Sequence, residues 1–321
     1  MGKLVKGIIT ALVVVGLIIF VAVMHQYRWD FTKLSTGNYE TNTYTVKEQF
    51  HSISVNTDTA DIIFAFSQDG TCTVECYEDP KSKHTVTVQG DTLAINLVEQ
   101  KAWYDYIGID FDSPKIKISL PQTYYNALEV KESTGDVQIA KEFTFEDVDI
   151  RLSTGHVAFH ADADRQVKIR TSTGSIRVEN TSAGMLDLAA STGGITVSNT
   201  ICAGDAHLEV STGKTMLDTF SCKNLSSEGD TGDISLNNVI VAEEIEIERS
   251  TGDVRFDGVD AAEISVETDT GDVTGTFLSE KVFIIETGTG RIDVPKSTTG
   301  GRCEISTDTG NIRLDVQKKA E

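Results

Sequence analysis

The sequence has few basic residues, and this excludes one large class of function. Its 321 residues include 28 lysines and arginines against 49 aspartates and glutamates, giving a formal charge of −21. A nucleic-acid-binding protein needs a basic surface to neutralise phosphates, whereas this excess of acids repels them. We therefore expect no nucleic-acid partner.

Cysteine, proline and aromatic residues are also scarce. Five cysteines are too few for a small secreted scaffold held by disulfides. The chain has 4 prolines and 7% aromatics beside 26 glycines, while 39% of its residues are hydrophobic. This apolar share suffices to bury a core, and the many glycines indicate compact, repetitive turns.

One long hydrophobic run lies near the start of the chain. Residues 7–24, GIITALVVVGLIIFVAVM, contain no charged residue, and a helix of this length spans roughly 27 Å, close to a bilayer core. Lys3 and Lys6 precede the run, so the positive-inside rule places the N-terminus in the cytoplasm. The sequence predicts a cytoplasmic tip and a single-pass transmembrane anchor over 1–24. A cleaved signal peptide and a buried core helix are the alternatives.

Farther along the chain, a Thr-Gly pair recurs at an almost constant interval. Successive glycines are 19 or 20 residues apart, and Ser or Asp precedes the threonine in nine of ten copies. Glycine suits a tight turn because it tolerates positive φ, and the Ser or Asp side chain can bond the turn backbone. The glycines that we expect at such turns are Gly135, Gly155, Gly174, Gly193, Gly213, Gly232, Gly252, Gly271, Gly290 and Gly310.

Each repeat carries two short stretches of alternating hydrophobic residues. Around Gly193, for example, Leu186 and Leu188 precede the turn, and Ile195 and Val197 follow it. A period of two marks a half-buried β-strand. A unit of 19–20 residues cannot bury its own apolar face, but stacked units can. The predicted fold is all-β, a parallel β-solenoid with two strands per coil, preceded by one N-terminal transmembrane helix; an antiparallel sandwich would not need so uniform a period.

The remaining segments complete the domain plan. Residues 25–44 are polar and unpatterned, which indicates a stalk between the membrane and the solenoid. Residues 45–125 are rich in predicted strands but irregular, and we expect them to form the first coils or a cap. The regular solenoid is predicted over 126–321.

The irregular part, 45–125, contains a degenerate repeat and an aromatic cluster. The stretch NTDTADIIFAF at 56–66 has Ala60 in the glycine position, 75 residues or about four coils before Gly135. The longest break in the pattern, 98–114, is either a cap over the core or a binding patch. Its candidate binding residues are Trp103, Tyr104 and Tyr106.

The acidic turns are weak candidates for calcium. Carboxylates stacked on a solenoid edge can chelate Ca²⁺, although an Asp that caps its own turn explains the same pattern. The candidate ligands are Asp230, Asp233, Asp269, Asp272 and Asp308. The six histidines share no ligand spacing, so the sequence predicts no zinc site and no cofactor.

Two cysteines occupy equivalent positions in consecutive repeats. Cys202 and Cys222 each stand nine residues after their glycine. Stacking should place their Cα atoms roughly 5 Å apart, within disulfide range. Either a disulfide or a pair of partly buried thiols satisfies this spacing.

A family resemblance rests on residues 115–139, KIKISLPQTYYNALEVKESTGDVQI, and on the STGDV and DTGDI units that follow. This pattern resembles the bacterial putative-adhesin family of β-strand-repeat proteins, a domain of unknown function often found behind one N-terminal membrane span. The resemblance implies a single-pass envelope protein, and it supplies no catalytic residue.

The functional prediction is a non-enzymatic, extracytoplasmic β-solenoid anchored in the cell membrane by residues 7–24. Its partners would be envelope glycans or other surface proteins, met in adhesion or scaffolding. One alternative is the ectodomain of an envelope-stress sensor. Another is a β-helical polysaccharide-active enzyme, although coils so uniform in length offer no loops to build a cleft. The Asp-Thr-Gly triplets match the aspartic-protease signature, but they recur at the coil period and are better explained as turns.

Overall fold

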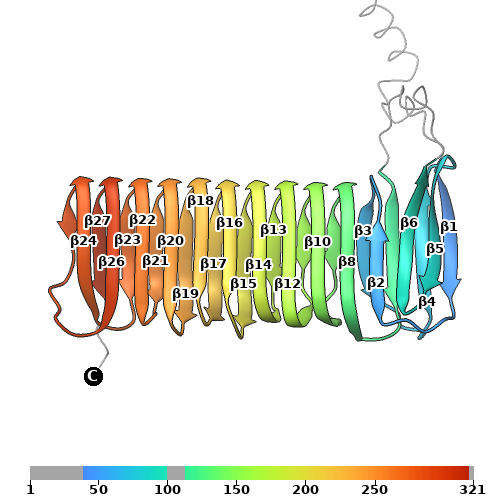
Figure 1. The fold of residues 1–321 in the computed structure, drawn as a ribbon, viewed down its shortest axis with the longest axis horizontal. Helices are drawn as coiled ribbons and strands as arrows, with labels where there is room; N and C mark the ends of the chain where they lie inside the picture. Colours follow the sequence, from blue (N-terminus) through green and yellow to red (C-terminus); the bar gives the residue numbers. More distant parts are fainter. Residues whose placement is uncertain (1–38, 100–112, 318–321) are drawn as a thin grey trace, which may run out of the picture.

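The alternating stretches of the sequence form β-strands throughout the part of the chain that the computed structural model describes, residues 39–99 and 113–317. The described residues form strands and connecting turns without any helix, and they stack into one elongated solenoid (Figure 1). Accordingly, none of these residues forms a helix long and apolar enough to cross a membrane. The predicted anchor over 1–24 lies outside the described residues.

The regular solenoid consists of coils of two strands each. The strand pairs are β8 (Tyr124–Thr134) with β9 (Val137–Ile139), β10 (Thr144–Thr154) with β11 (Val157–Phe159), β12 (Asp162–Thr173) with β13 (Ile176–Glu179), β14 (Ser182–Thr192) with β15 (Ile195–Cys202), β16 (Ala206–Thr212) with β17 (Thr215–Cys222), β18 (Leu225–Thr231) with β19 (Ile234–Val241), β20 (Glu244–Thr251) with β21 (Val254–Val259), β22 (Glu263–Thr270) with β23 (Val273–Phe277), β24 (Lys281–Thr289) with β25 (Ile292–Asp293), and β26 (Gly301–Thr309) with β27 (Ile312–Val316).

Each strand pairs in parallel with its equivalent in the next coil. Thr154 lies opposite Thr134 on one side and opposite Thr173 on the other, so the repeat threonines stack in register. The predicted parallel β-solenoid with two strands per coil is therefore confirmed.

Close stacking explains the glycine in each turn. Gly193 has a φ of 136°, and a Cβ added there would lie only 1.9 Å from the carbonyl oxygen of Gly174. Any other residue would be strained in this conformation and would also collide with the preceding coil.

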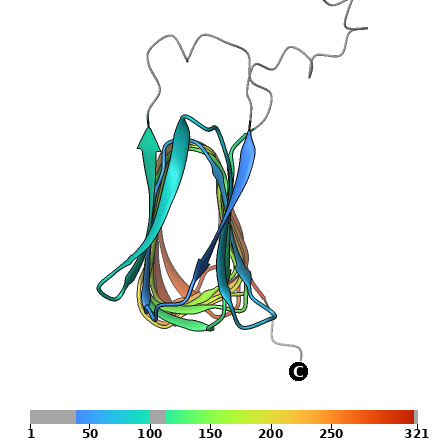
Figure 2. The same ribbon diagram turned by 90° about the vertical axis from the view of Figure 1, so that its right-hand side faces the viewer.

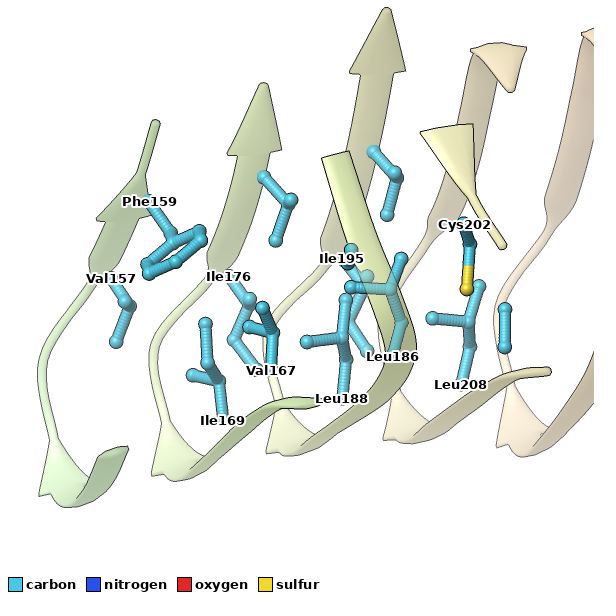
Figure 3. Close-up of a cluster of buried hydrophobic side chains, with 14 of the residues drawn as sticks. Val157, Phe159, Val167, Ile169, Ile176, Leu186, Leu188, Ile195, Cys202 and Leu208 are labelled. Atoms are coloured by element: carbon cyan, nitrogen blue, oxygen red, sulfur yellow. The ribbon is translucent and has the colours of Figure 1, made fainter. Parts of the chain in front are cut away.

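The core lies between the two walls of the solenoid. Val167 and Ile169 on β12 and Leu186 and Leu188 on β14 point into this space, and Ile195 faces them from the opposite wall (Figure 3). These side chains are at most 1% exposed. Most coils add one apolar residue to each inward-facing column, and the core therefore runs along the stack.

The N-terminal part forms one further pair of coils and a cap. Its strands are β1 (Glu40–Val46), β2 (Ser52–Asn56), β3 (Asp61–Phe66), β4 (Cys72–Glu78), β5 (Ser82–Gln89), β6 (Thr92–Glu99) and β7 (Lys115–Leu120). Strands β2 and β3 form one coil, and β6 and β7 form the next one outward. Strands β1, β4 and β5 do not belong to the parallel coils. Strand β4 pairs antiparallel with both β1 and β7, and β5 pairs antiparallel with β6 (Figure 2). Strand β1 begins at Glu40, inside the segment 25–44 that we expected to be a stalk.

The degenerate repeat lies directly beside the first regular coil. Ile62 pairs with Val137, and Ala60 occupies the place of a corner glycine under Gly135. The sequence spacing had suggested a separation of about four coils, which is wrong. The described residues between β3 and β8 form the cap strands β4 and β5 and the outer coil β6–β7 instead of filling the gap between the two turns.

The last two coils also depart from chain order. Strand β26 pairs with β22 on one side and with β24 on the other, so the final coil lies inside its predecessor in the stack. Gly310 consequently stacks on Gly271, and Gly290 stacks on Gly310. The outermost C-terminal coil is β24–β25 (Figure 1).

Candidate functional site

An aspartate follows four of the ten Thr-Gly pairs, and its side chain helps to join one coil to the next. Asp136 Oδ1 accepts a hydrogen bond from the backbone N–H of His156 at 2.8 Å. Farther along the stack, Asp253 Oδ1 accepts from the N–H of Asp272 at 2.9 Å, and Asp272 Oδ1 accepts from the N–H of Asn311 at 2.7 Å. The recurrence of Thr-Gly-Asp thus has a structural cause, since this carboxylate binds the backbone of the neighbouring turn.

The five candidate calcium ligands do not come together as one ligand set. Asp233 Oδ2 contacts Lys214 Nζ at 2.9 Å, and this hydrogen bond lowers the pKa of Asp233. Asp269 and Asp308 lie in adjacent coils because β26 lies beside β22. Within residues 39–99 and 113–317, only one group of three His, Cys, Asp or Glu ligand atoms lies within 4.8 Å of one another, and it contains none of the candidate aspartates.

The five cysteines are free and buried. The pairing of Ile201 with Ser221 places Cys202 and Cys222, the next residues along, in neighbouring coils. Burial raises the pKa of both thiols. The structure therefore places this pair as two inward-facing thiols. The aromatic candidates Trp103, Tyr104 and Tyr106 lie outside the described residues.

A ladder of glutamates runs along one wall of the C-terminal half. Consecutive coils place Glu209 opposite Glu228, Glu228 opposite Glu248, and Glu248 opposite Glu267. We call these four residues the acidic ladder. All four are exposed, and none forms an ion pair with the residues that the structure describes. Like charges in register on neighbouring strands, about 4.8 Å apart, repel one another.

The same column is basic in the N-terminal half. Lys131, Arg151 and Arg170 occupy consecutive coils, and Ala189 separates them from Glu209. Each basic residue has a carboxylate partner: Lys131 Nζ lies 2.5 Å from Glu129, Arg151 Nη2 2.6 Å from Asp149, and Arg170 Nη2 3.1 Å from Asp187. The basic residues of the column therefore each have an ion-pair partner, whereas the acidic ladder forms no ion pair among the described residues.

A shallow groove of about 290 Å³ follows the acidic ladder. Its lining includes Glu228, Glu248 and Glu267 of the ladder, together with Asp230 and Asp269 from the adjoining turns. Two of the aspartates singled out in the sequence thus contribute to one electronegative surface.

Arg249 lies beneath this surface and is 5% exposed. Its Nη2 donates to Ser227 Oγ at 2.8 Å and to Thr215 Oγ1 at 3.3 Å, and its Nη1 donates to the carbonyl of Glu248 at 3.1 Å. A Cβ on Gly229 would lie 2.5 Å from Nη1. Gly229 therefore leaves room for the guanidinium, and the hydroxyls of Thr215 and Ser227, which stand at core positions, accept hydrogen bonds from it. Burial lowers the pKa of Arg249 to about 10, while the nearby charge of Glu228 opposes this shift.

A second polar cluster is buried in the N-terminal cap. Cys76 and Glu78 on β4 and His84 on β5 are at most 3% exposed, and their ligand atoms lie within 4.8 Å of one another. His84 Nδ1 lies 2.7 Å from Glu78 Oε2, and Nε2 lies 2.8 Å from Thr57 Oγ1. Asn42 Nδ2 donates to the other carboxylate oxygen, Oε1, at 2.8 Å. We call Cys76, Glu78 and His84 the cap cluster.

Neither the acidic ladder nor the cap cluster was predicted from the sequence. The ladder could have been found, because its four glutamates all stand four residues before their glycine. The sequence contains only a weak indication of the cap cluster. Glu78 continues the inward-facing alternation of Cys72, Val74 and Cys76, and a turn at 79–81 returns the chain toward His84. Because β4 lies outside the coil repeat, no register could have shown that these residues meet.

The fold and these surfaces define a parallel β-solenoid whose described coils present flat walls and shallow grooves. The chain belongs to the Toastrack DUF4097 family, whose model matches residues 50–217 and 204–321. The predicted membership in a domain family of unknown function is thereby confirmed. No curated protein matches the chain significantly.

Several solved structures resemble the chain. A putative adhesin from Bacteroides fragilis is 16% identical, with a TM-score of 0.44, and one from Parabacteroides merdae is 13% identical, with a TM-score of 0.45. A protein from Parabacteroides distasonis described as a putative lipid binding protein is 12% identical, with a TM-score of 0.43. Each match covers 88% of this chain and 98% of the other. None of these likenesses bears on what this chain binds.

Proposed function

We propose that this protein is a non-enzymatic, membrane-anchored solenoid of the bacterial cell envelope, and that its acidic ladder engages a cationic partner on another surface molecule. Residues 7–24 would hold it in the membrane with the N-terminus in the cytoplasm. The solenoid would then project into the extracytoplasmic space, where it acts in adhesion or as a scaffold.

The acidic ladder is the observation that carries this proposal. Glu209, Glu228, Glu248 and Glu267 repel one another, and no lysine or arginine among the described residues pairs with them. If these glutamates served only to keep the protein soluble, they could be paired with basic residues, as the charged residues in the N-terminal half of the column are. A partner with regularly spaced cationic groups would relieve the repulsion and would associate rapidly through electrostatic steering.

The solenoid walls also favour a contact surface over a catalytic cleft. The coils differ by only one residue in the spacing of their turns, and the groove along the ladder is shallow. Apart from Arg249, which is buried, its charged lining residues are all acidic. An enzyme acting on polysaccharides would be expected to bring an acid and a base together above a bound substrate.

Binding to a cationic surface tests the ladder. The double variant Glu228→Gln, Glu248→Gln removes two adjacent charges, whereas the matched control Glu142→Gln, Glu244→Gln removes two exposed glutamates elsewhere. The probe is an immobilised polylysine surface titrated with the full-length protein at several salt concentrations. We expect weaker binding and a smaller salt dependence for the ladder variant only. Equal weakening in both variants would show that only net charge matters and would refute the proposed role of the ladder.

Localisation is tested separately. We expect the full-length protein in the membrane fraction of bacterial cells, with its solenoid accessible to protease added from outside the cytoplasmic membrane. Deletion of 1–24 should release it from the membrane. A full-length protein found in the soluble fraction would contradict the anchor.

A further inference from the structure

We propose that the cap cluster is a zinc site, in which Cys76 Sγ, Glu78 Oε2 and His84 Nδ1 hold one Zn²⁺ ion. Thiolate, imidazole and carboxylate are the protein ligands that Zn²⁺ prefers. Zn²⁺ with one thiolate, one carboxylate and a neutral imidazole has no net charge, which suits a fully buried position.

The three ligand atoms are already close to the arrangement that zinc requires. Zinc bonds of 2.0–2.3 Å in a tetrahedron place neighbouring ligand atoms roughly 3.3–3.7 Å apart. In the structure, one ligand atom from each of the three residues lies within 4.8 Å of the other two, and Nδ1 and Oε2 are 2.7 Å apart. Movements of about 1 Å would complete the geometry, with a water molecule as the fourth ligand.

Thr57 can orient the imidazole both with and without the metal. A hydroxyl donates or accepts, so Thr57 Oγ1, 2.8 Å from Nε2, can donate to Nε2 while Nδ1–H donates to Glu78. When zinc binds, the neutral imidazole takes its other tautomer: the proton leaves Nδ1, a proton is taken up from water at Nε2, and Nε2–H donates to the same oxygen. The Cys76 thiol releases its proton to solvent as it becomes a thiolate ligand. Metal-ligating histidines characteristically donate their second ring N–H in this way.

The carboxylate and the strands are also held in place. Glu78 Oε1 accepts from Asn42 Nδ2 on β1, and Glu78 Oε2 accepts from the backbone N–H of His84 at 2.7 Å. Tyr44 on β1 donates its hydroxyl to the carbonyl of His84 at 2.9 Å. The site therefore joins β1, β4 and β5, and Thr57 connects it to the first coil after β2. Zinc would fasten the cap to the end of the solenoid, where it protects the open edge of the sheet.

The first test is spectroscopic and uses the full-length protein in detergent micelles. Co²⁺ should bind with a stoichiometry of one per chain and give a thiolate-to-cobalt charge-transfer band, which one equivalent of Zn²⁺ abolishes. Cys76→Ser should lose this band. Cys72→Ser should keep it, because Cys72 is a buried cysteine on the same face of β4 but outside the cluster. No band in the wild type, a band in Cys76→Ser, or its loss in Cys72→Ser would overturn the proposal.

Two further measurements guard against a variant that fails to fold. X-ray absorption at the zinc edge of the wild type should show one sulfur ligand near 2.3 Å and nitrogen or oxygen ligands near 2.0–2.1 Å. A shell without sulfur would refute the site. Thr57→Val, which removes the partner of Nε2, should weaken the affinity by 10- to 100-fold while keeping one metal per chain. Unchanged affinity would refute the positioning role of Thr57.

Discussion

The buried carboxyl of Glu132 makes the stability of the solenoid depend on pH. Glu132 is 6% exposed and lies in the first regular coil, beneath the turn that contains Ala60. Its Oε1 accepts from the N–H of Ala60 at 2.9 Å, whereas Oε2 has no hydrogen-bond partner. Burial raises the pKa of Glu132 to about 8, with the nearby charges of Asp61, Asp136 and Asp58 acting in the same direction.

The sign of the effect follows from proton linkage. A pKa raised from 4.5 in the unfolded chain to about 8 in the folded protein means that the folded state binds more protons between these pH values. The stabilisation is complete below about pH 4.5 and is lost as pH rises through 8. The difference corresponds to about 5 kcal/mol of unfolding free energy, or on the order of 10 °C in Tm for a chain of this size.

The variant Glu132→Gln tests this reasoning, because glutamine is neutral at every pH. Thermal unfolding followed by circular dichroism between pH 5 and pH 9 should show Tm of the wild type falling relative to that of Glu132→Gln. The matched control is Glu129→Gln on the same strand, whose carboxylate is 43% exposed and paired with Lys131. Its profile should follow that of the wild type. Parallel pH profiles for the wild type and Glu132→Gln would refute the assignment.

Three other substitutions or reactions test the packing. Gly193→Ala should lower the free energy of unfolding in urea by several kcal/mol, since the Cβ of the new alanine would overlap the carbonyl of Gly174. A change in unfolding free energy of less than about 0.5 kcal/mol would contradict the stacked turn. Arg249→Ala should cost about 2–4 kcal/mol in the same assay because it leaves a cavity and strands the Ser227 hydroxyl, and unchanged stability would show that the guanidinium is not held there. A thiol reagent should modify no cysteine in the folded protein at pH 8 but should modify all five in denaturant. Each thiol is buried in the folded protein and has a raised pKa. Rapid labelling of the folded protein would refute that burial.

Much of the regular solenoid could be predicted because each repeat specifies its own register. The glycine of each turn fixes where the chain reverses, and the apolar columns fix which side chains face inward. Once Gly174 and Gly193 are aligned, the pairing of Ile176 with Ile195 follows without further information. Such a repeat contacts only its neighbours, so local pattern and global fold agree.

The ends of the stack could not be predicted in the same way. The repeat glycines Gly271, Gly290 and Gly310 are evenly spaced, yet the third lies between the other two in space. Each of these coils presents apolar residues and a corner glycine in the same register, so the pattern is equally satisfied by either order. In the structure, the connection 294–300 leads from β25 back to β26, which lies between β22 and β24.

The acidic ladder and the cap cluster differ in the same respect, namely in whether a repeat in the sequence specifies them. The sequence by itself determined the acidic ladder, because a residue type repeated at a fixed distance from a turn must form a column when the turns stack. Only the tertiary structure decided that Cys76, Glu78 and His84 share one buried position. Their strands leave the coil path, and antiparallel pairing in the cap brings together side chains whose spacing in the sequence follows no period.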